Sequence, residues 1–376
     1  MLVWIQNPFD NLPGEGFRKQ RYWMMAEAFV RAGHRVVLWT ADFSHALKAR
    51  REAPAQAPGI SVRLVPTRQY AKNVSFDRVA SHLDYARAWR NLAINEPERP
   101  ALVVTSLPTI SAAAAAVCFG REIGAKTVVD VQDVWPGTFL RLAPRMLRPL
   151  ARLALGPLEA KARRVLRTAD RVTGVCDAYR EAVGRADYFR AYLGIELAPM
   201  PADSRRPCNR QRKVHLVYAG GLGRTYGLKA VIDAVAANLE MELDLAGFGA
   251  APDIPPSAAG RIRFHGALGA EALGALLAAA DIGVVPMAAE SGVGLPNKIF
   301  DYAAAGLGIV SSLGGESSAL LARYRCGTDY LAGDQASFTA AVRKALTLAP
   351  GASRQLCEEQ FDARKIYDGY VAEVTG

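Results

Sequence analysis

Short apolar runs rich in β-branched residues alternate with helical patterns along the whole chain. Several runs, such as Leu102–Thr105 and Thr127–Asp130, are apolar on both faces, which is typical of parallel strands covered by helices on both sides. In the first half the runs predict strands at Leu2–Gln6, Arg35–Thr40, Ser61–Val65, Ala101–Ser106, Lys126–Val131 and Arg171–Val175. Helical spacing between them predicts helices such as Phe17–Ala32 and Phe76–Asn95.

The alternation begins again after Ala198–Lys213, a segment rich in Pro, Arg and Asp that we interpret as a linker. The second half predicts strands at Val214–Tyr218, Glu242–Ala246, Arg261–His265, Ile282–Val285 and Gly308–Ser311, and a last helix at Ser353–Val374. The pattern predicts an α/β protein with two Rossmann-like, doubly wound parallel-sheet domains that face a cleft. We place the domains at residues 1–200 and 201–376, the second including the terminal helix.

The most informative segment is Glu290–Gly306, which predicts a glycine loop and then a helix after a buried strand. The loop contains Gly292 and Gly294, and the helix is predicted to open at Pro296 and to stop at Gly306. Glycines let a backbone approach a ligand closely, and a helix N-terminus presents free N–H groups to an anion. A buried connection with a charged surface turn is the alternative interpretation.

Polar side chains at the start of that helix suit a nucleotide. Lys298 adds a positive charge, and Asn297 or Lys298 shares a helix face with Asp301 about one turn later. A carboxylate there accepts hydrogen bonds from a sugar diol. A phosphate-binding loop, a lysine and a diol acceptor together indicate a nucleotide site.

Two further glycine loops follow the first predicted strand of each domain. Asn7–Gly16 ends in Gly16 but lacks the G-x-G-x-x-G spacing, so it does not support a dinucleotide fingerprint. Tyr218–Gly227 contains Gly221 and Arg224, whose guanidinium suits a diphosphate. A plain connecting loop and a solvated turn arginine are the respective alternatives.

Polar residues also follow the strand Lys126–Val131. Asp133 is the candidate to orient an acceptor hydroxyl or to act as a base, whereas Asp130 is expected to hold the end of the strand. The stretch Arg145–Arg167 mixes basic residues with leucines, which indicates either an anionic membrane contact or an ordinary solvated helix.

Composition narrows the class of protein. The 376 residues carry a net charge of +10, which favours an anionic partner. Nucleic acid is not expected, because no helix-turn-helix, zinc or RNA-recognition signature is present. The histidines are dispersed, so no metal site is predicted. The five cysteines are scattered, and the sequence shows no membrane-length apolar run and no basic leader. We therefore expect a cytoplasmic protein with reduced thiols.

Together these motifs resemble the family-four retaining glycosyltransferases of the GT-B fold, over nearly the whole chain. The most specific likeness lies in Val217–Arg224, Leu243–Gly249, Ile262–Gly266, Ala279–Pro286 and Gly315–Glu316. Leu295–Gly306 is similar to a bacterial subgroup that assembles lipopolysaccharide, capsule or exopolysaccharide. The resemblance implies an acceptor-binding first domain and a second domain that binds the nucleotide-sugar.

The resemblance also implies roles for single residues. Asp301 stands at the ribose-binding position of the family's E-x7-E pair, and Glu290 is assigned to the first, sugar-contacting and catalytic position. Gln132 stands where many relatives have a histidine, so a catalytic histidine is not supported there. The donor site is expected to comprise Gly16, Gly221, Arg224, Gly292, Gly294, Leu295, Asn297, Lys298, Asp301 and Glu316, with Asp133 and Glu290 as catalytic candidates.

The implied reaction moves a hexosyl or N-acetylhexosaminyl group from a nucleotide diphosphate-sugar, with UDP as the expected nucleotide, to an acceptor hydroxyl with retention. No cofactor or metal is expected, because Arg224 and Lys298 would neutralise the leaving diphosphate. The acceptor is a saccharide or is linked to a lipid diphosphate, and Arg145–Arg167 would then bind peripherally at the inner face of the plasma membrane.

Other functions fit the same composition. A nucleotide-sugar epimerase or a phosphorylase would keep the fold and change the reaction, and an acceptor-transfer assay separates them. A non-enzymatic two-lobed binding protein would be expected to carry an export signal, and none is visible. An NAD-dependent dehydrogenase would need the dinucleotide fingerprint that the chain lacks.

Overall fold

The computed structural model describes residues 1–51, 56–71, 75–137, 140, 145–197, 213–223, 226–288 and 291–376. The chain divides into two compact units, Met1–Tyr192 with Arg364–Gly376, and Leu193–Ala363. The predicted second domain included the terminal helix, whereas in the structure Arg364–Gly376 belong to the first unit. Most of the predicted linker, and the boundary predicted at residue 200, lie outside the described residues.

The first unit is built on a seven-stranded sheet in the order β5-β2-β1-β6-β7-β8-β9, in which all pairs are parallel. Its strands are β1 (Leu2–Gln6), β2 (Arg35–Ala41), β5 (Ile60–Val65), β6 (Leu102–Leu107), β7 (Lys126–Val131), β8 (Arg171–Gly174) and β9 (Phe189–Arg190). A small antiparallel pair, β3 (Phe43–Ser44) and β4 (Ala49–Arg50), follows β2. The strand order reverses between β1 and β6, which is the usual position of a ligand in such sheets.

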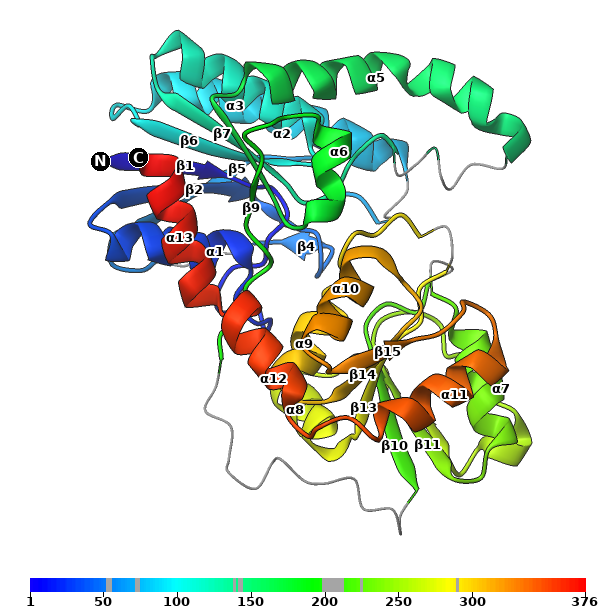
Figure 1. Ribbon diagram of the computed structural model, residues 1–376. Helices are drawn as coiled ribbons and strands as arrows, with labels where there is room; N and C mark the ends of the chain where they lie inside the picture. Colours follow the sequence, from blue (N-terminus) through cyan, green and yellow to red (C-terminus); the bar gives the residue numbers. More distant parts are fainter. Residues whose placement is uncertain are drawn as a thin grey trace. The chain divides into compact units, whose positions relative to one another are not determined.

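Helices cover both faces of this sheet. Figure 1 shows α2 (Phe76–Asn95), α3 (Ile110–Glu122) and α5 (Arg148–Thr168) on one face, and α1 (Arg21–Arg31) and α13 (Ala363–Thr375) on the other. Shorter helical turns are η1 (Arg145–Leu147), η2 (Asp177–Tyr179) and α6 (Arg180–Val183). Under α2 and α3, the side chains of Trp4, Trp39, Trp89 and Phe119 form the aromatic part of the core.

The second unit has a six-stranded parallel sheet in the order β12-β11-β10-β13-β14-β15. Its strands are β10 (Val214–Ala219), β11 (Met241–Ala246), β12 (Ile262–Phe264), β13 (Ile282–Val285), β14 (Gly308–Ser311) and β15 (Gly327–Asp329). The order reverses between β10 and β13, so both units show the doubly wound arrangement that the sequence predicts.

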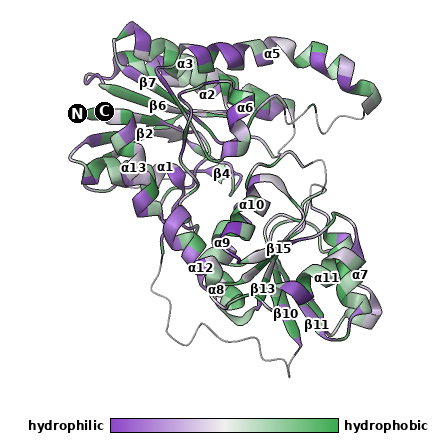
Figure 2. Cartoon of the chain, in the orientation of Figure 1, coloured by the Kyte–Doolittle hydropathy of each residue, from purple (hydrophilic) through white to green (hydrophobic). Residues whose placement is uncertain are grey.

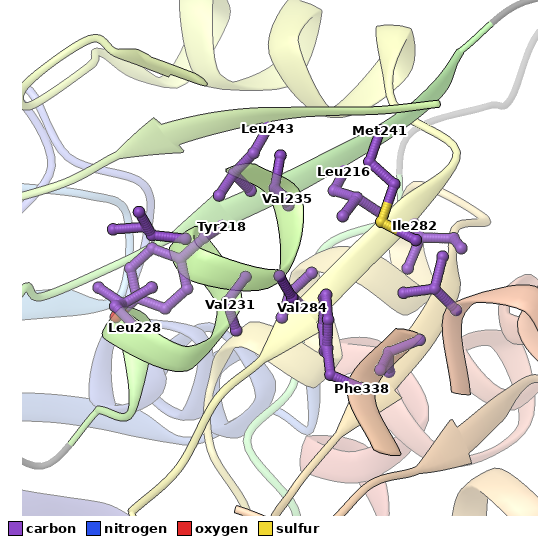
Figure 3. Close-up of a cluster of buried hydrophobic side chains, with 14 of the residues drawn as sticks. Leu216, Tyr218, Leu228, Val231, Val235, Met241, Leu243, Ile282, Val284 and Phe338 are labelled. Carbon is purple, nitrogen blue, oxygen red and sulfur yellow. The ribbon is translucent and has the colours of Figure 1, made fainter. Parts of the chain in front are cut away.

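The helices of the second unit also lie on both faces of its sheet. They are α7 (Leu228–Ala237), α8 (Ala270–Ala279), α9 (Lys298–Ala304), α10 (Gly315–Arg323), α11 (Gln335–Ala345) and α12 (Ala352–Leu356), with short turns η4 (Pro256–Ala258) and η5 (Cys357–Phe361). Figure 3 shows the core in which Leu216 and Val284 of the strands meet Val231 of α7 and Phe338 of α11. Figure 2 shows hydrophobic residues concentrated in the strands, as the apolar runs predict.

The predicted terminal helix Ser353–Val374 is interrupted. α12 continues into the π-helical turn η5, and Asp362 then adopts extended backbone before α13 begins. Backbone pairing causes the break, because Ile195 donates to the Phe361 carbonyl at 2.9 Å and accepts from the Ala363 amide at 3.0 Å. A local helical pattern does not reveal that a distant segment will compete for these backbone groups.

Candidate nucleotide-sugar site

Three loops follow β10, β11 and β12 at the carboxyl edge of the second sheet, and their backbones pack together. The Gly220 amide donates to the Ala246 carbonyl at 2.8 Å, and the Gly247 amide donates to the Gly266 carbonyl at 2.7 Å. A methyl group added at Gly247 would lie 1.7 Å from the Gly220 carbonyl oxygen. Glycine at position 247 is therefore a requirement of this close approach, and its φ of +150° is one that L side chains rarely adopt.

Lys298 lies against the first of these loops. A methyl group added at Gly220 would lie 2.6 Å from Lys298 Nζ, so the ammonium group is next to the Gly220–Gly221 backbone. The Lys298 ammonium also lies 4.9 Å from the ring centre of Tyr218 and 4.0 Å from that of Tyr226. The loop and the lysine, which the sequence analysis assigned separately, thus meet where the strand order reverses between β10 and β13.

Burial sets the charge of this lysine. Lys298 is only 6% exposed, and burial lowers its pKa to about 8, an effect that the negative charge of Asp301 partly offsets. The side chain is therefore still mostly protonated at neutral pH. A buried lysine held on two aromatic rings is an unfavourable arrangement for the free protein and a favourable one for binding an anion.

Tyr302 fixes α9 against the sheet. Its hydroxyl accepts a hydrogen bond from the Ala219 amide at 2.9 Å and donates to the Val284 carbonyl at 3.3 Å, so it joins the ends of β10 and β13. Its ring lies against Gly283, where an added methyl group would come within 2.3 Å of the ring carbons. These contacts place Lys298, one turn before Tyr302, at the end of β10.

The glycine segment before α9 differs from the prediction in one respect. The helix begins at Lys298, because Asn297 is its N-cap, and not at Pro296. Gly292 has a φ of +68°, whereas Leu295 is buried and offers a ligand only its backbone. The predicted stop is confirmed, since the helix ends at Ala304 and Gly306 adopts a φ of +74°.

Three other predicted donor residues are described in the same unit. Asn297 is exposed, and Asp301 is half-buried in the first turn of α9. Glu316 is half-buried in the first turn of α10, directly after β14. Arg224 and Glu290 lie outside the described residues, and their roles stay predictions. Within the described part of the chain, no group of three or more His, Cys, Asp or Glu side chains could hold a metal ion.

In the first unit, Asp130 holds the end of β7, as expected. It is fully buried and accepts hydrogen bonds from the Arg21 guanidinium at 2.7 and 2.8 Å, from the Tyr22 hydroxyl at 2.7 Å and from the Thr173 hydroxyl at 2.7 Å. The Arg21 charge and these bonds hold the pKa of Asp130 below its usual range in spite of burial. Asp130 is thus a structural ion-pair residue.

The other two predicted residues of the first unit lie in loops at the same edge of the sheet. Gly16 has a φ of +79° and lies in the loop between β1 and α1. Asp133 follows β7, is half-buried and accepts a hydrogen bond from the Trp135 indole N–H at 2.8 Å. Gly16 belongs to the unit that does not contain Lys298.

Sequence reasoning missed the aromatic part of the donor site. Tyr218 was noted only as the start of a glycine loop, and Tyr226 and Tyr302 were given no role. Tyr218 lies near the end of β10, Tyr226 lies just before α7 and Tyr302 lies one turn into α9, and these positions are a signal that the sequence did offer. Reasoning from motifs also treated His45 and His82 as dispersed, although His45 follows β3 and His82 lies in α2, and the ring of Phe9 contacts both.

Comparison with known protein families gives two matches. A glycosyl transferase 4-like domain matches residues 19–192, and a glycosyl transferases group 1 domain matches residues 213–347. The chain belongs to the family-four-type glycosyltransferases. Each match lies within one unit and covers most of it, so the family assignment applies to both units. A search of curated proteins found no match.

Solved structures agree with this family in fold. Sucrose-phosphate synthase from Thermosynechococcus elongatus is similar with a TM-score of 0.73 and 15% identity, covering 99% of this chain and 98% of that one. HepE of Anabaena in complex with UDP has a TM-score of 0.66 and 15% identity, and the match covers 100% of this chain and 99% of that one. The lipopolysaccharide outer core galactosyltransferase WaaB has a TM-score of 0.62 and 13% identity, and the match covers 100% of this chain and 99% of that one. This glycosyltransferase therefore has the two-domain GT-B fold.

Proposed function

We propose that this glycosyltransferase moves a hexosyl or N-acetylhexosaminyl group from a nucleotide diphosphate-sugar to an acceptor hydroxyl and retains the anomeric configuration. The observation that supports the proposal best is Lys298, a buried cation held against the Gly220–Gly221 backbone where the second sheet reverses its strand order. A diphosphate placed there would meet a fixed positive charge and backbone N–H groups, which is how enzymes stabilise a leaving group that gains negative charge.

Each donor residue then has a distinct role. Lys298, with Arg224, neutralises the diphosphate as the bond between the sugar and its oxygen breaks. Asp301 accepts hydrogen bonds from the ribose diol, and the backbone between Gly292 and Leu295, together with Glu316 and Glu290, meets the transferred sugar. Because these cations supply the charge that a metal would otherwise supply, we expect no metal requirement.

The acceptor belongs to the first unit in this proposal. Asp133, whose carboxylate accepts a hydrogen bond from the Trp135 indole, orients the acceptor hydroxyl for attack on the sugar. A carboxylate is an acceptor of hydrogen bonds and suits contact with a substrate hydroxyl. The catalytic assignment of Asp133 is thus a proposal about positioning the nucleophile at the carboxyl edge of the first sheet.

The choice of donor and pathway is supported by relatives of the same fold. HepE was crystallised with UDP and with UDP-glucose, and WaaB is a galactosyltransferase of the lipopolysaccharide outer core. We therefore propose a UDP-sugar as the donor and polysaccharide assembly of the cell envelope as the context. A saccharide on a lipid diphosphate is the acceptor that such assembly supplies.

The surface of α5 supports a membrane partner. Its first half is exposed, with Leu150 at 66% and Leu153 at 78%, and Met146 just before it at 92%. The second half exposes basic side chains, and Figure 2 shows hydrophilic and hydrophobic residues alternating along the helix. We define the basic face of α5 by three exposed arginines: Arg152, Arg164 and Arg167.

A peripheral enzyme at the inner face of the plasma membrane would use this face on anionic headgroups and the leucines at the interface. None of the described helices is long and apolar enough to cross a membrane. Docking at the surface is therefore the mode of membrane contact that we propose.

A transfer assay tests the proposed reaction. Nucleotide diphosphate-sugars are first screened for thermal stabilisation of the protein, because a ligand that binds only the folded state raises its apparent stability. The best donor is then incubated with saccharide and lipid-linked acceptors in EDTA, and the product anomer is read by NMR. The proposal predicts a retained anomer and full activity in EDTA. An inverted anomer, or activity restored only by Mg²⁺, would contradict it.

A further inference from the structure

A group of side chains in the first unit has no role in the proposed donor site. They come from the loops after β1, β2, β5 and β7 and from the first turns of α2, so all lie at the carboxyl edge of the first sheet. We call them the aromatic–basic cluster, which consists of Phe9, His45, Tyr70, Arg78, His82 and Trp135. That edge is where ligands bind in doubly wound sheets.

Arg78 lies at the centre of the cluster. Its guanidinium carbon is 5.4 Å from the ring centre of Phe9 and 5.2 Å from that of Trp135. Aromatic rings hold a cation in place without neutralising its charge. The ring of His82, from the next turn of the same helix, lies 5.2 Å from that of Phe9 and 6.1 Å from that of Trp135. The guanidinium of Arg78 is thus held in place by the aromatic rings of the cluster.

A second cation lies beside the cluster. The Lys48 ammonium is 4.6 Å from the ring centre of Tyr70 and 3.3 Å from Nδ1 of His45, and that nitrogen is 2.6 Å from the Tyr70 hydroxyl. Lys48 and Arg78 are both close enough to His45 for their charges to act on it. Burial, followed by the charge of Arg78, lowers the pKa of Lys48, whereas the charge of Asp133 favours the protonated form of Arg78. An anion bound beside Lys48 would favour its charged form.

The two histidines are neutral at physiological pH. Burial, followed by the positive charges of Lys48 and Arg78, lowers the pKa of His45 to about 4. Burial, followed by the charge of Arg78, lowers the pKa of His82 to about 4 as well. Nε2 of His82 is buried and has no hydrogen-bond partner among the described residues. The cluster thus combines two cations with neutral imidazoles that retain hydrogen-bonding capacity.

We propose that the aromatic–basic cluster binds a phosphate group that belongs to the acceptor, with Arg78 and Lys48 as its charge partners. This inference rests on the proposed sugar transfer, because it assigns the acceptor of that reaction. Arginine and lysine are the side chains that most often bind phosphate, and Phe9 and Trp135 offer flat apolar surfaces to the sugar that carries it. The cluster would then select acceptors by charge.

The phosphate has two chemical sources, a lipid carrier or a soluble sugar phosphate. The outer face of α2 favours the lipid carrier, because Phe76 and Val79 are exposed at 95% and 58% while Arg78 faces the cluster. Leu83, at 41% exposure, continues the same face one turn later. Exposed apolar side chains beside a bound phosphate suit a phosphate that is joined to a lipid chain.

The test compares Arg78→Gln and Lys48→Gln with Arg87→Gln, an exposed arginine of the same helix that lies outside the cluster. The probes are glucose 6-phosphate in solution and phosphatidylcholine vesicles that contain a polyprenyl phosphate. Binding is followed by tryptophan fluorescence with Trp135→Phe as the reference, and by vesicle flotation. Each cluster variant should weaken phosphate binding at least about tenfold, because charge-assisted hydrogen bonds to phosphate are strong.

The outcomes separate this inference from the proposed function. Loss of binding in both cluster variants, with Arg87→Gln and the binding of UDP unchanged, supports the site; whichever probe shows the loss identifies the source of the phosphate. Equal binding of both probes by wild type and both variants would overturn it, as would equally good competition by unphosphorylated glucose. Failure of UDP to bind the wild type would instead count against the donor site alone.

Discussion

Replacing Lys298 with methionine should stabilise the protein and weaken its binding of UDP at the same time. Methionine keeps the length and apolar bulk of the side chain and removes the ammonium group. Lysine at this position is buried, and its pKa falls from 10.5 to about 8. That difference corresponds to about 3 kcal/mol of unfavourable free energy in the folded protein while the lysine is protonated.

The sign follows from the direction of the shift. Because the folded-state pKa is below the unfolded one, the penalty is complete below pH about 8 and disappears as the pH rises to 10.5. Contacts with the Tyr218 and Tyr226 rings offset about 0.5–2 kcal/mol of it. Lys298→Met should therefore raise the free energy of unfolding by about 1–2 kcal/mol at pH 7, and this increase should vanish at alkaline pH.

The loss in binding has the opposite sign. The diphosphate loses a charged hydrogen-bond partner, which costs about 1.5–3 kcal/mol or roughly 10- to 100-fold in Kd. Urea unfolding at pH 7 and pH 10 measures the stability, and calorimetric titration with UDP measures the affinity. Lys229→Met, at an exposed lysine paired with Asp233, is the matched control and should change neither. A Lys298→Met variant that is less stable and binds UDP normally would refute the reasoning.

Three further outcomes are expected. Asp301→Ala should raise the Kd for UDP about tenfold and leave the Kd for a 2′,3′-dideoxy analogue unchanged, since the lost contact is to the ribose diol; an equal effect on both nucleotides would contradict this role. Tyr302→Phe should lower the free energy of unfolding by about 1 kcal/mol, measured by urea titration, because the Ala219 amide loses its acceptor. Changing the basic face of α5 to glutamine should reduce flotation with anionic liposomes, whereas glutamine at the exposed Arg323, Arg343 and Lys344 should not.

The sheets were predictable because their signal is local. β1, β7, β13 and β14 have the predicted bounds, since each strand is a short apolar run that is followed by a polar residue or by proline. α2 also has its predicted bounds, and Ser75 caps it by accepting a hydrogen bond from the Arg78 amide. The predicted start of α9 was about half a turn too early, because Pro296 precedes the helix and does not open it.

The site was predictable only in part, because its contacts join distant positions. Lys298 and the Gly220 loop were both identified from the sequence, but nothing local shows that the ammonium would rest on Tyr218 and Tyr226. The aromatic–basic cluster was missed for the same reason, since it draws on four loops that only the folded sheet brings together. Motifs identify which residues a strand end carries, whereas packing decides which strand ends meet.

The location of the donor site is the central claim, and hydrogen exchange with mass spectrometry tests it most directly. The protein is labelled with and without saturating UDP, with GDP and dTDP as alternatives. The account predicts slower exchange in peptides that cover Ala219–Gly223 and Gly292–Asp301, and no such protection in Lys298→Met. A nucleotide that binds and protects neither segment, or protection that Lys298→Met leaves intact, would contradict it.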